Sequence, residues 1–382
     1  MAVSGAPIGV FYLALCGAMG LYLPYLSLYL SSAGLSRGAA VQVQAVVPFM
    51  SLFVPPLLGL VADARHARVW LLRGFSAAAV VTFAAVGLAG GNVVAIAAAL
   101  AAFALARAPL MALADATAHE HVRHHGGSYG RLRTWGSLGY FVAALLAGTL
   151  YDITSISLMI WMTTAVLGVL AGCAWRMPAV PPRREAGTFD DVGRLLRTPS
   201  FWLFLVAIAI GLAAGACYDT TLALHLAQLG YGKDFLGLVI AVGVATETVL
   251  IAFSGRILAR FRSEHTLAVA FAAGVLRWLL LAMGTSRVAI LAQAPLHAIT
   301  FGLYWVSATT LMREYAGPRA SASGQGLLGA AVAVGGIVAN VVGGALLERG
   351  GGRLLYGAAS GVAAVAAGLA AWHAVALRRA AR

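Results

Sequence analysis

Three ionisable side chains interrupt apolar stretches in the second half of the chain. Glu247 stands in the run LGLVIAVGVATETVLIAFSG, and Arg277 and His297 stand in the two apolar stretches that follow. A charge at the centre of a membrane helix costs about 2.5 to 3.5 kcal/mol on insertion scales, so it needs a partner or a function. Glu247 and Arg277 are predicted to meet near mid-membrane, because each lies more than ten residues from the loop that joins their helices. They are either a structural ion pair or a site at which protonation of Glu247 frees Arg277 for an anion.

A second set of charges lies in the first half. Arg107 precedes Asp115 by two helical turns on nearly the same face, and Arg133 opens the next apolar stretch. Asp115 and Arg133 could pair across the helix hairpin, as a structural clamp or as a substrate contact. Arg107 reaches toward mid-membrane, where a lone arginine is more often functional than structural.

The elements that carry these residues are apolar and long. Of 382 residues, 61% are hydrophobic and 10% charged, against roughly 25% charged in soluble domains. Stretches long enough to span a bilayer predict an all-α polytopic membrane protein with twelve transmembrane helices, the first retained and not cleaved as a signal peptide. They lie at approximately 8–30, 41–61, 69–90, 92–118, 132–151, 154–175, 199–229, 235–257, 265–284, 286–311, 322–347 and 352–376.

The net charge of +13 is explained by the loops and does not indicate nucleic-acid binding. Of the 26 lysines and arginines, 19 fall at one set of helix ends and five at the opposite set. The positive-inside rule then places both termini in the cytoplasm. Cys16, Cys173 and Cys217 lie in apolar stretches, where a disulfide framework is not expected.

The chain also repeats itself. A shift of 196 residues lays LSLYLSSAGL (26–35) over LALHLAQLGY (222–231). An even number of helices per half gives two halves of the same orientation, related by an axis along the membrane normal. We therefore predict a six-helix bundle at 1–176, a cytoplasmic linker at 177–198 and a second six-helix bundle at 199–382.

The loop GLVADARHAR carries Gly59, Asp63 and Arg68 at the spacing G-x-x-x-D-x-x-x-x-R. It resembles the signature cytoplasmic loop of the major facilitator superfamily. That resemblance implies two six-helix bundles with pseudo-two-fold symmetry, and a conformational switch at these three residues. The second half has Gly255 at the equivalent position without the following aspartate.

Further residues resemble the branch of this superfamily that contains the lactose permease, nucleoside symporter and phenylpropionate transporter types. They are YGRLRTWGSLGY at 129–140, the 18-residue spacing of Asp115 and Arg133, Tyr218-Asp219, Glu247, Arg277 and Leu296-His297. The resemblance implies proton coupling through Glu247, Asp219 and His297. It implies substrate contacts from Arg277, Asp115 and Arg133, to which we add Arg107 because of its place near mid-membrane.

The sequence also departs from the sugar permeases of this branch. Thr300 stands where those permeases have a glutamate after the histidine, and Leu222 where they have a second aspartate. RW at 277–278 and LHAITFGLYW at 296–305 look closer to the phenylpropionate type. Aromatic walls for a planar substrate are then expected from Tyr22, Tyr25, Tyr218, Tyr304 and Trp305.

These features favour a secondary active transporter that takes up a small organic acid, aromatic acids included, together with protons. The alternatives are a sugar or nucleoside proton symporter and a drug/proton antiporter. We expect a monomer in the bacterial cytoplasmic membrane whose partners are the substrate, protons and lipid, without a cofactor. An enzyme is disfavoured, because the histidines of HEHVRHHGG lie among arginines and glycines that indicate a solvated loop and no metal site. A channel is disfavoured by the oppositely charged midplane groups.

Overall fold

The computed structural model describes residues 5–64, 68–178, 193, 195–317 and 321–380. Within these ranges the secondary structure is helical and contains no strand. The packing divides the chain into two compact units. Unit 1 comprises Met1–Arg184 and Leu222–Ala241, and unit 2 comprises Glu185–Thr221 and Val242–Arg382. The predicted boundaries of the two bundles remain a prediction, and most of the predicted linker lies outside the described residues.

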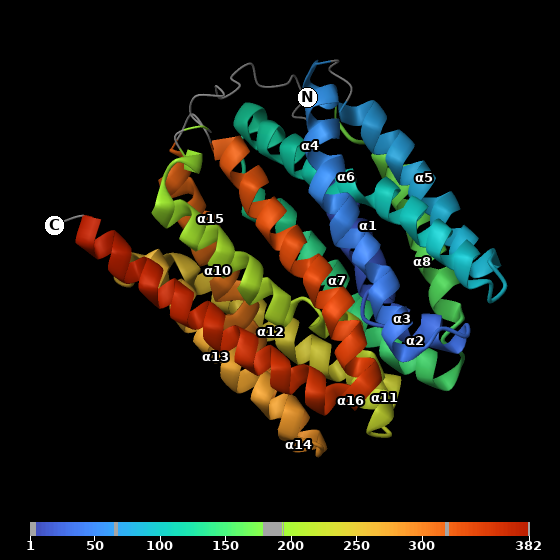
Figure 1. Cartoon of the computed structure of the whole chain (residues 1–382). Coiled ribbons are helices and arrows are strands. Elements are labelled where there is room, and N and C mark those ends of the chain that lie inside the picture. Colours follow the sequence, from blue (N-terminus) through green and yellow to red (C-terminus); the bar gives the residue numbers. More distant parts are fainter. Residues whose placement is uncertain (1–4, 65–67, 179–192, 194, 318–320, 381–382) are drawn as a thin grey trace. The chain divides into compact units, whose positions relative to one another are not determined.

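Unit 1 is built on the contact of its first helix with two later ones. Helix α1 packs on α7 and α8, and α6 packs on α4 and α5 (Figure 1). Glycine permits the α1–α7 contact, because a Cβ atom on Gly139 would lie 2.3 Å from the Leu13 carbonyl oxygen. The elements are α1 (Ala6–Tyr22), α2 (Leu26–Ser32), α3 (Arg37–Gln42), η1 (Val43–Ala45), α4 (Val46–Ala64), α5 (Arg68–Leu88), α6 (Val93–His125), α7 (Tyr129–Ile153) and α8 (Leu158–Ala174).

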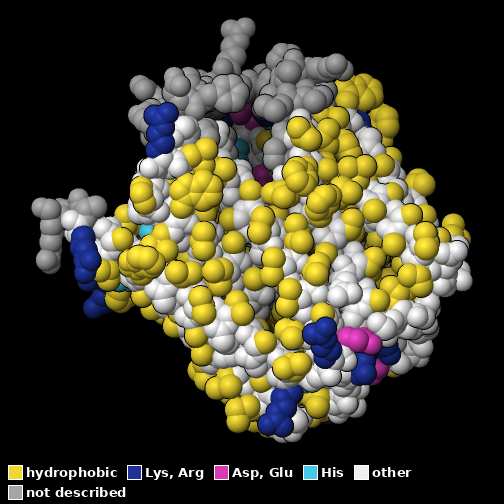
Figure 2. Space-filling model, viewed as in Figure 1, with side chains coloured by type: hydrophobic (Ala, Val, Ile, Leu, Met, Phe, Trp, Pro, Cys, Tyr) yellow, Lys and Arg dark blue, Asp and Glu magenta, His cyan; other side chains and the backbone are white. Residues whose placement is uncertain are grey.

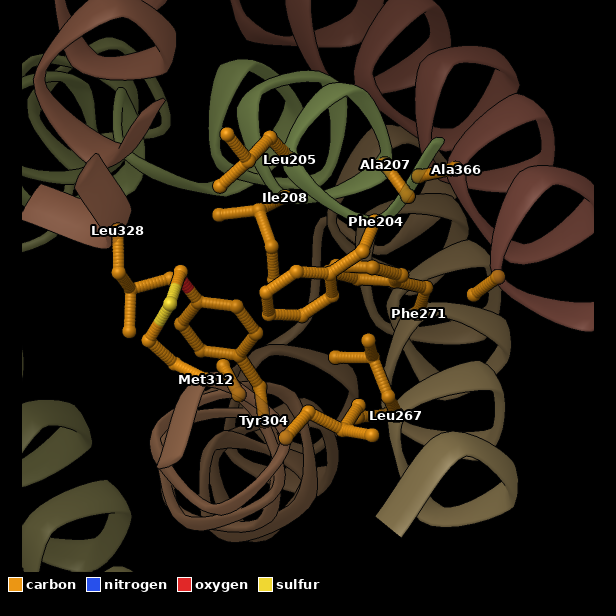
Figure 3. Packing of buried hydrophobic residues seen from close by; sticks show 14 of the residues in the cluster. Phe204, Leu205, Ala207, Ile208, Leu267, Phe271, Tyr304, Met312, Leu328 and Ala366 are labelled. Atoms are coloured by element: carbon orange, nitrogen blue, oxygen red, sulfur yellow. The ribbon is translucent and has the colours of Figure 1, made fainter. Parts of the chain in front are cut away.

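Unit 2 is organised by its last helix, which packs on α10 and α13. Its core contains the rings of Phe204, Phe271 and Tyr304, which point toward one another (Figure 3). The elements are α10 (Pro199–Gly215), the start of α11 (Tyr218–Gln228), most of α12 (Lys233–Arg260), α13 (Ser263–Met283), α14 (Arg287–Gln293), η2 (Ala294–Leu296), η3 (Ala298–Leu303), α15 (Tyr304–Ala316) and α16 (Ser321–Ala380). Helix α16 kinks at Gly350 and Gly351.

The helices confirm a polytopic membrane protein. In the part of the chain that the structure describes, nine helices are long and apolar enough to cross a membrane, or ten when the bent pair α1 and α2 counts as one span. Helix α8 has only 17 residues, and α16 runs on through its kink. Counting α8 and dividing α16 is consistent with the twelve predicted spans. Hydrophobic side chains are spread over the face seen in Figure 2, among the white atoms of the backbone and of other side chains.

The predicted repeat has a geometric counterpart. Gly34 ends α2 with a φ of 104° and Gly230 ends α11 with a φ of 80°, 196 residues later. The residue after each glycine makes the same backbone hydrogen bond. The Leu35 amide donates to the Leu30 carbonyl at 3.1 Å, and the Tyr231 amide donates to the Leu226 carbonyl at 2.9 Å. Glycine suits both ends because it adopts positive φ without a steric penalty.

Candidate functional site

Among the described arginines of unit 2, Arg277 is the most deeply buried, with 2% of its surface exposed. Its Nε donates to Gln293 Oε1 at 3.0 Å, its Nη1 donates to Thr300 Oγ1 at 2.7 Å, and Nη1 lies 3.1 Å from His297 Nδ1. Nη2 has no hydrogen-bond partner among the described residues. The cation is therefore held by uncharged side chains, with one donor nitrogen unused.

Two aromatic rings complete the surroundings of this guanidinium. Its Cζ lies 4.3 Å from the centroid of Tyr218 and 4.7 Å from that of Trp278. Both distances are within the range of cation–π attraction, which strengthens when the cation is desolvated. Trp278 was missed from the sequence as a site residue, although it follows Arg277 directly.

His297 joins Arg277 to Glu247. An arginine nitrogen can only donate, so His297 Nδ1 must accept and the ring proton must sit on Nε2. His297 Nε2 in turn lies 3.1 Å from Glu247 Oε2. This geometry assigns a neutral imidazole that donates to the Glu247 carboxylate.

The prediction that Glu247 and Arg277 contact each other directly is therefore wrong, because the imidazole of His297 lies between the two charges. Counting residues along the helices gives the depth of a side chain in the membrane, but not the direction in which it leaves its helix. The spacing of Glu247 and Arg277 along the sequence therefore does not reveal that a third side chain lies between them.

The backbone around His297 departs from α-helical geometry. A 3₁₀ turn at Ala294–Leu296 precedes it and a π-helical turn at Ala298–Leu303 follows it. Pro295 lacks an amide hydrogen, which removes one helical hydrogen bond at this point. Single π turns inside helices are frequent at functional sites. The irregular segment places His297 at a junction where the turn of the helix changes.

Asp219 belongs to the same group of charges. It lies in the first turn of α11, just after the break that separates α10 from α11. Its surface is exposed, and it interacts electrostatically with His297, Arg277 and Glu247. Unit 2 therefore brings together four of the ionisable residues predicted as site residues.

Unit 1 holds a separate polar cluster around Asp115. Its Oδ1 accepts from Tyr12 Oη at 2.5 Å and from Tyr129 Oη at 3.0 Å. Arg133 lies over the Tyr12 ring at 5.5 Å from the centroid, and its Nη1 is 3.7 Å from Cys16 Sγ. The ion pair that Asp115 and Arg133 could form is not present, and the carboxylate instead accepts from two phenols through Oδ1. The sequence did not single out these tyrosines as partners of Asp115.

Arg107 is a half-buried cation on α6 of unit 1. Its Nη1 contacts Met19 Sδ at 3.6 Å, and its Nε has no hydrogen-bond partner among the described residues. No described carboxylate pairs with it. Like Arg277, it is an arginine inside a membrane span whose charge is not neutralised by direct contact.

The other aromatic residues expected at the site have packing contacts. Tyr22 is buried against Phe83 and Phe103, with ring centroids 5.2 and 5.4 Å away. Tyr25 donates to the Ala144 carbonyl at 2.8 Å. Tyr304 lies in the core of unit 2 (Figure 3) and Trp305 is exposed. Of these four, Tyr22 is within electrostatic range of a site cation, Arg107.

The remaining predicted residues are those of the loop GLVADARHAR and the histidines of HEHVRHHGG. The side chain of Asp63 and the surroundings of Gly59 lie outside the described residues, and Arg68 is half-buried at the start of α5. The solvated loop expected at HEHVRHHGG is wrong as far as His125, because these residues form the end of α6 and include the buried Glu120 and His121. There the ring of His119 stacks on that of Tyr129, with 3.9 Å between the centroids. The described residues contain no group of three side chains suited to hold a metal ion.

Comparison with known proteins identifies the family. The sequence model described as MFS_1 like family matches residues 7–358. The chain therefore belongs to the major facilitator superfamily and is a membrane transporter of that family. This confirms the resemblance seen in the loop GLVADARHAR.

Its relatives and structural neighbours are transporters. The chain is 27% identical to the maltose permease of Geobacillus stearothermophilus over 89% of this chain and 87% of that protein. It is 26% identical to a probable 3-phenylpropionic acid transporter of Escherichia coli strain K12, over 74% and 75%. The crystal structure of the nucleoside transporter NupG matches with a TM-score of 0.79 at 17% identity, over 96% of this chain and 98% of that one. A bacterial homolog of the lysosomal transporter Spinster matches with 0.78 at 14% identity, over 96% and 95%. These likenesses confirm the major facilitator fold.

Proposed function

We propose that this member of the major facilitator superfamily takes up a small organic acid together with protons, by alternating access across the bacterial cytoplasmic membrane. Arg277 receives the substrate carboxylate, and Glu247 with His297 takes the proton. The protein acts as a monomer with both termini in the cytoplasm. The observation that carries the proposal is a buried guanidinium with only uncharged partners, one free nitrogen and a histidine bridge to a carboxylate.

Arg277 is suited to an anion because its charge is held and not neutralised. Gln293 and Thr300 orient the guanidinium without cancelling its charge. A substrate carboxylate that bound Nη1 and Nη2 together would form the bidentate arrangement that arginine makes best. The faces of Tyr218 and Trp278 beside the guanidinium would suit an apolar or aromatic body on the same substrate.

The bridge through His297 links proton uptake to this binding step. A proton on His297 Nδ1 cannot coexist with the Arg277 Nη1 donor at 3.1 Å. A proton on Glu247 removes the charge that holds the other side of the ring. Either event loosens His297 from Arg277 and frees Nη1 for the substrate. Proton uptake therefore precedes and favours anion binding.

The charge of the site is then the same in both forms of the carrier. Counting Arg277, Glu247 and the substrate, the empty site holds one cation and one anion, and the loaded site holds the Arg277 cation, the substrate anion and a protonated Glu247. Asp219 contributes equally to both forms. A group of charges inside a membrane is least costly when it is neutral overall. The empty carrier and the fully loaded carrier can therefore both change conformation. A carrier with substrate but no proton has one extra negative charge, which makes the same change more costly.

Uptake of a neutral sugar or nucleoside is the second candidate function. Asp115 favours it, because a carboxylate that already accepts from Tyr12 and Tyr129 can accept from substrate hydroxyls in the same way. A relative named as a maltose permease and a structural neighbour named as a nucleoside transporter support this alternative. The relative named as a probable 3-phenylpropionic acid transporter supports the acid.

Purified protein in proteoliposomes tests the proposal. Labelled 3-phenylpropionate, other small organic acids, maltose and a nucleoside are offered with and without an inwardly directed proton gradient. We expect accumulation of at least one acid that depends on the gradient and collapses with a protonophore. Accumulation of maltose or the nucleoside alone would move the assignment to the second candidate.

A further inference from the structure

Two glycines stand opposite the imidazole and the carboxylate of the proposed proton site. A Cβ atom on Gly243 of α12 would lie 3.3 Å from His297 Cβ, and one on Gly302 would lie 3.2 Å from Glu247 Cγ. Each helix therefore presents a glycine to the ionisable side chain of the other. At these separations the side chain opposite an added methyl group would have to move by a few tenths of an ångström.

The π-helical turn explains how Gly302 comes to face α12. In an α-helix a residue five positions after His297 would be rotated by about 140° around the axis. A π turn closes its hydrogen bonds over five residues, so Gly302 follows His297 by one turn on nearly the same face. On α12, Gly243 and Glu247 are four residues apart and share a face in the ordinary α-helical way.

The arrangement is reciprocal, with a glycine matched to a large side chain on each side. It brings the two helices close enough for His297 Nε2 to lie 3.1 Å from Glu247 Oε2. Gly302 is buried, and the other atoms nearest its added Cβ belong to the apolar Leu250 and Ile251. Leu250 and Ile251 lie at ordinary contact distances of 3.5 and 3.6 Å, so Glu247 is the side chain that must move to admit a methyl group.

We propose that Gly243 and Gly302 are positioning residues for proton coupling, which rests on the proposed function. They hold His297 within hydrogen-bond range of Glu247, and so set how strictly the release of Arg277 depends on a proton. A methyl group at either position lengthens the hydrogen bond, loosens His297 and lets Arg277 accept the substrate without a proton.

Other groups around the pair do not touch these glycines. Arg277 approaches His297 from α13, and Asp219 and Tyr218 approach it from α11. None of them supplies any of the three atoms nearest to the added Cβ of Gly243 or Gly302. The glycine variants therefore alter the distance between His297 and Glu247 while leaving the charges in place.

The test compares coupling with substrate movement. Gly302→Ala and Gly243→Ala are reconstituted in proteoliposomes, and influx of labelled 3-phenylpropionate is measured together with proton influx from a pH-sensitive dye. Gly255→Ala is the matched control, because it lies on α12 with nothing within 4 Å of an added Cβ. We expect the number of protons moved per substrate to fall by about 2- to 12-fold, which is the factor that corresponds to the free energy of one hydrogen bond. Substrate exchange without a gradient should persist and depend less on pH.

The outcomes separate this inference from the proposed function. Wild-type protein that moves 3-phenylpropionate without protons contradicts the proposed function. A coupled wild type with the same proton ratio in all three variants contradicts the role of the glycines. Loss of exchange in step with accumulation contradicts it too, since the glycines would then serve packing alone. If Gly302→Ala does not fold, Gly243→Ala carries the test, and misfolding of both beside a folded Gly255→Ala overturns the proposal.

Discussion

The carboxylate of Glu247 and the guanidinium of Arg277 contact opposite nitrogens of one imidazole, that of His297, each at 3.1 Å. The two charges are therefore not an isolated ion pair that only offsets the cost of burial. A neutral ring between them can change its protonation, and such a change alters the contacts of both. This relationship gives the proposed coupling a defined site.

Glu247→Gln mimics a permanently protonated carboxylate. We expect substrate exchange to persist, its affinity to lose dependence on pH, and accumulation driven by a pH gradient to vanish. The variant is measured by counterflow and by gradient-driven uptake in the same vesicles. If Glu247→Gln unfolds while Glu247→Gln/Arg277→Gln restores both folding and accumulation, the residues are structural, and Asp219 and His297 become the next candidates for the proton site.

Arg107 and Arg277, the two arginines deep inside membrane spans, should differ from other arginines in their effect on binding. Arg277→Gln is expected to weaken binding of an organic acid by about 10- to 150-fold, the loss of a charge-assisted hydrogen bond of roughly 1.5 to 3 kcal/mol. Arg107→Gln tests the corresponding cation of unit 1. Equilibrium binding of labelled 3-phenylpropionate is the measurement, with the exposed Arg131→Gln as control. Unchanged affinity in both variants would favour a neutral substrate.

The ion pair of Asp152 with Lys233 offers a chemical probe of unit 1. Asp152 Oδ1 lies 3.2 Å from both the amide nitrogen and Nζ of Lys233, the only lysine in the sequence. An exposed pair contributes roughly 0.2 to 1 kcal/mol, so Asp152→Asn should raise the reactivity of Lys233 toward an amine-specific ester by about 1.4- to 5-fold. Mass spectrometry of the Lys233 peptide reads the rate. Asp234→Asn, one residue away, is the control, and equal rates in both variants would argue against a protective pair.

Gly148 is expected to be intolerant of a side chain. Its added Cβ would lie 2.4 Å from the Lys233 carbonyl oxygen and 3.2 Å from Gly237 Cα, so α7 and the start of α12 meet backbone to backbone. Gly148→Ala should destabilise the protein by about 1 to 3 kcal/mol through overpacking. Gly168→Ala, with nothing within 4 Å of its added Cβ, should not. Thermal unfolding in detergent compares the two, and equal melting temperatures would contradict the close contact.

Much of the fold could be predicted from the sequence alone. Apolar segments of spanning length predicted a polytopic helical protein, and the loop with Gly59, Asp63 and Arg68 indicated the family that the comparison confirmed. The repeat at 196 residues reappears in the glycine ends of α2 and α11. These features are local, because hydrophobicity, turn chemistry and short spacing act within one segment of the chain.

The partners of the charged residues were decided by the tertiary structure. Residue counting placed Glu247 and Arg277 at similar depth, since a helix rises by about 1.5 Å per residue. It could not place His297 between them, or two phenols on Asp115, because a partner depends on the direction of each side chain and on how closely the helices approach. The 3₁₀ and π turns beside His297 change that direction within one helix, and glycines at 243 and 302 set the approach. Both effects arise from packing between distant segments, which no single segment specifies.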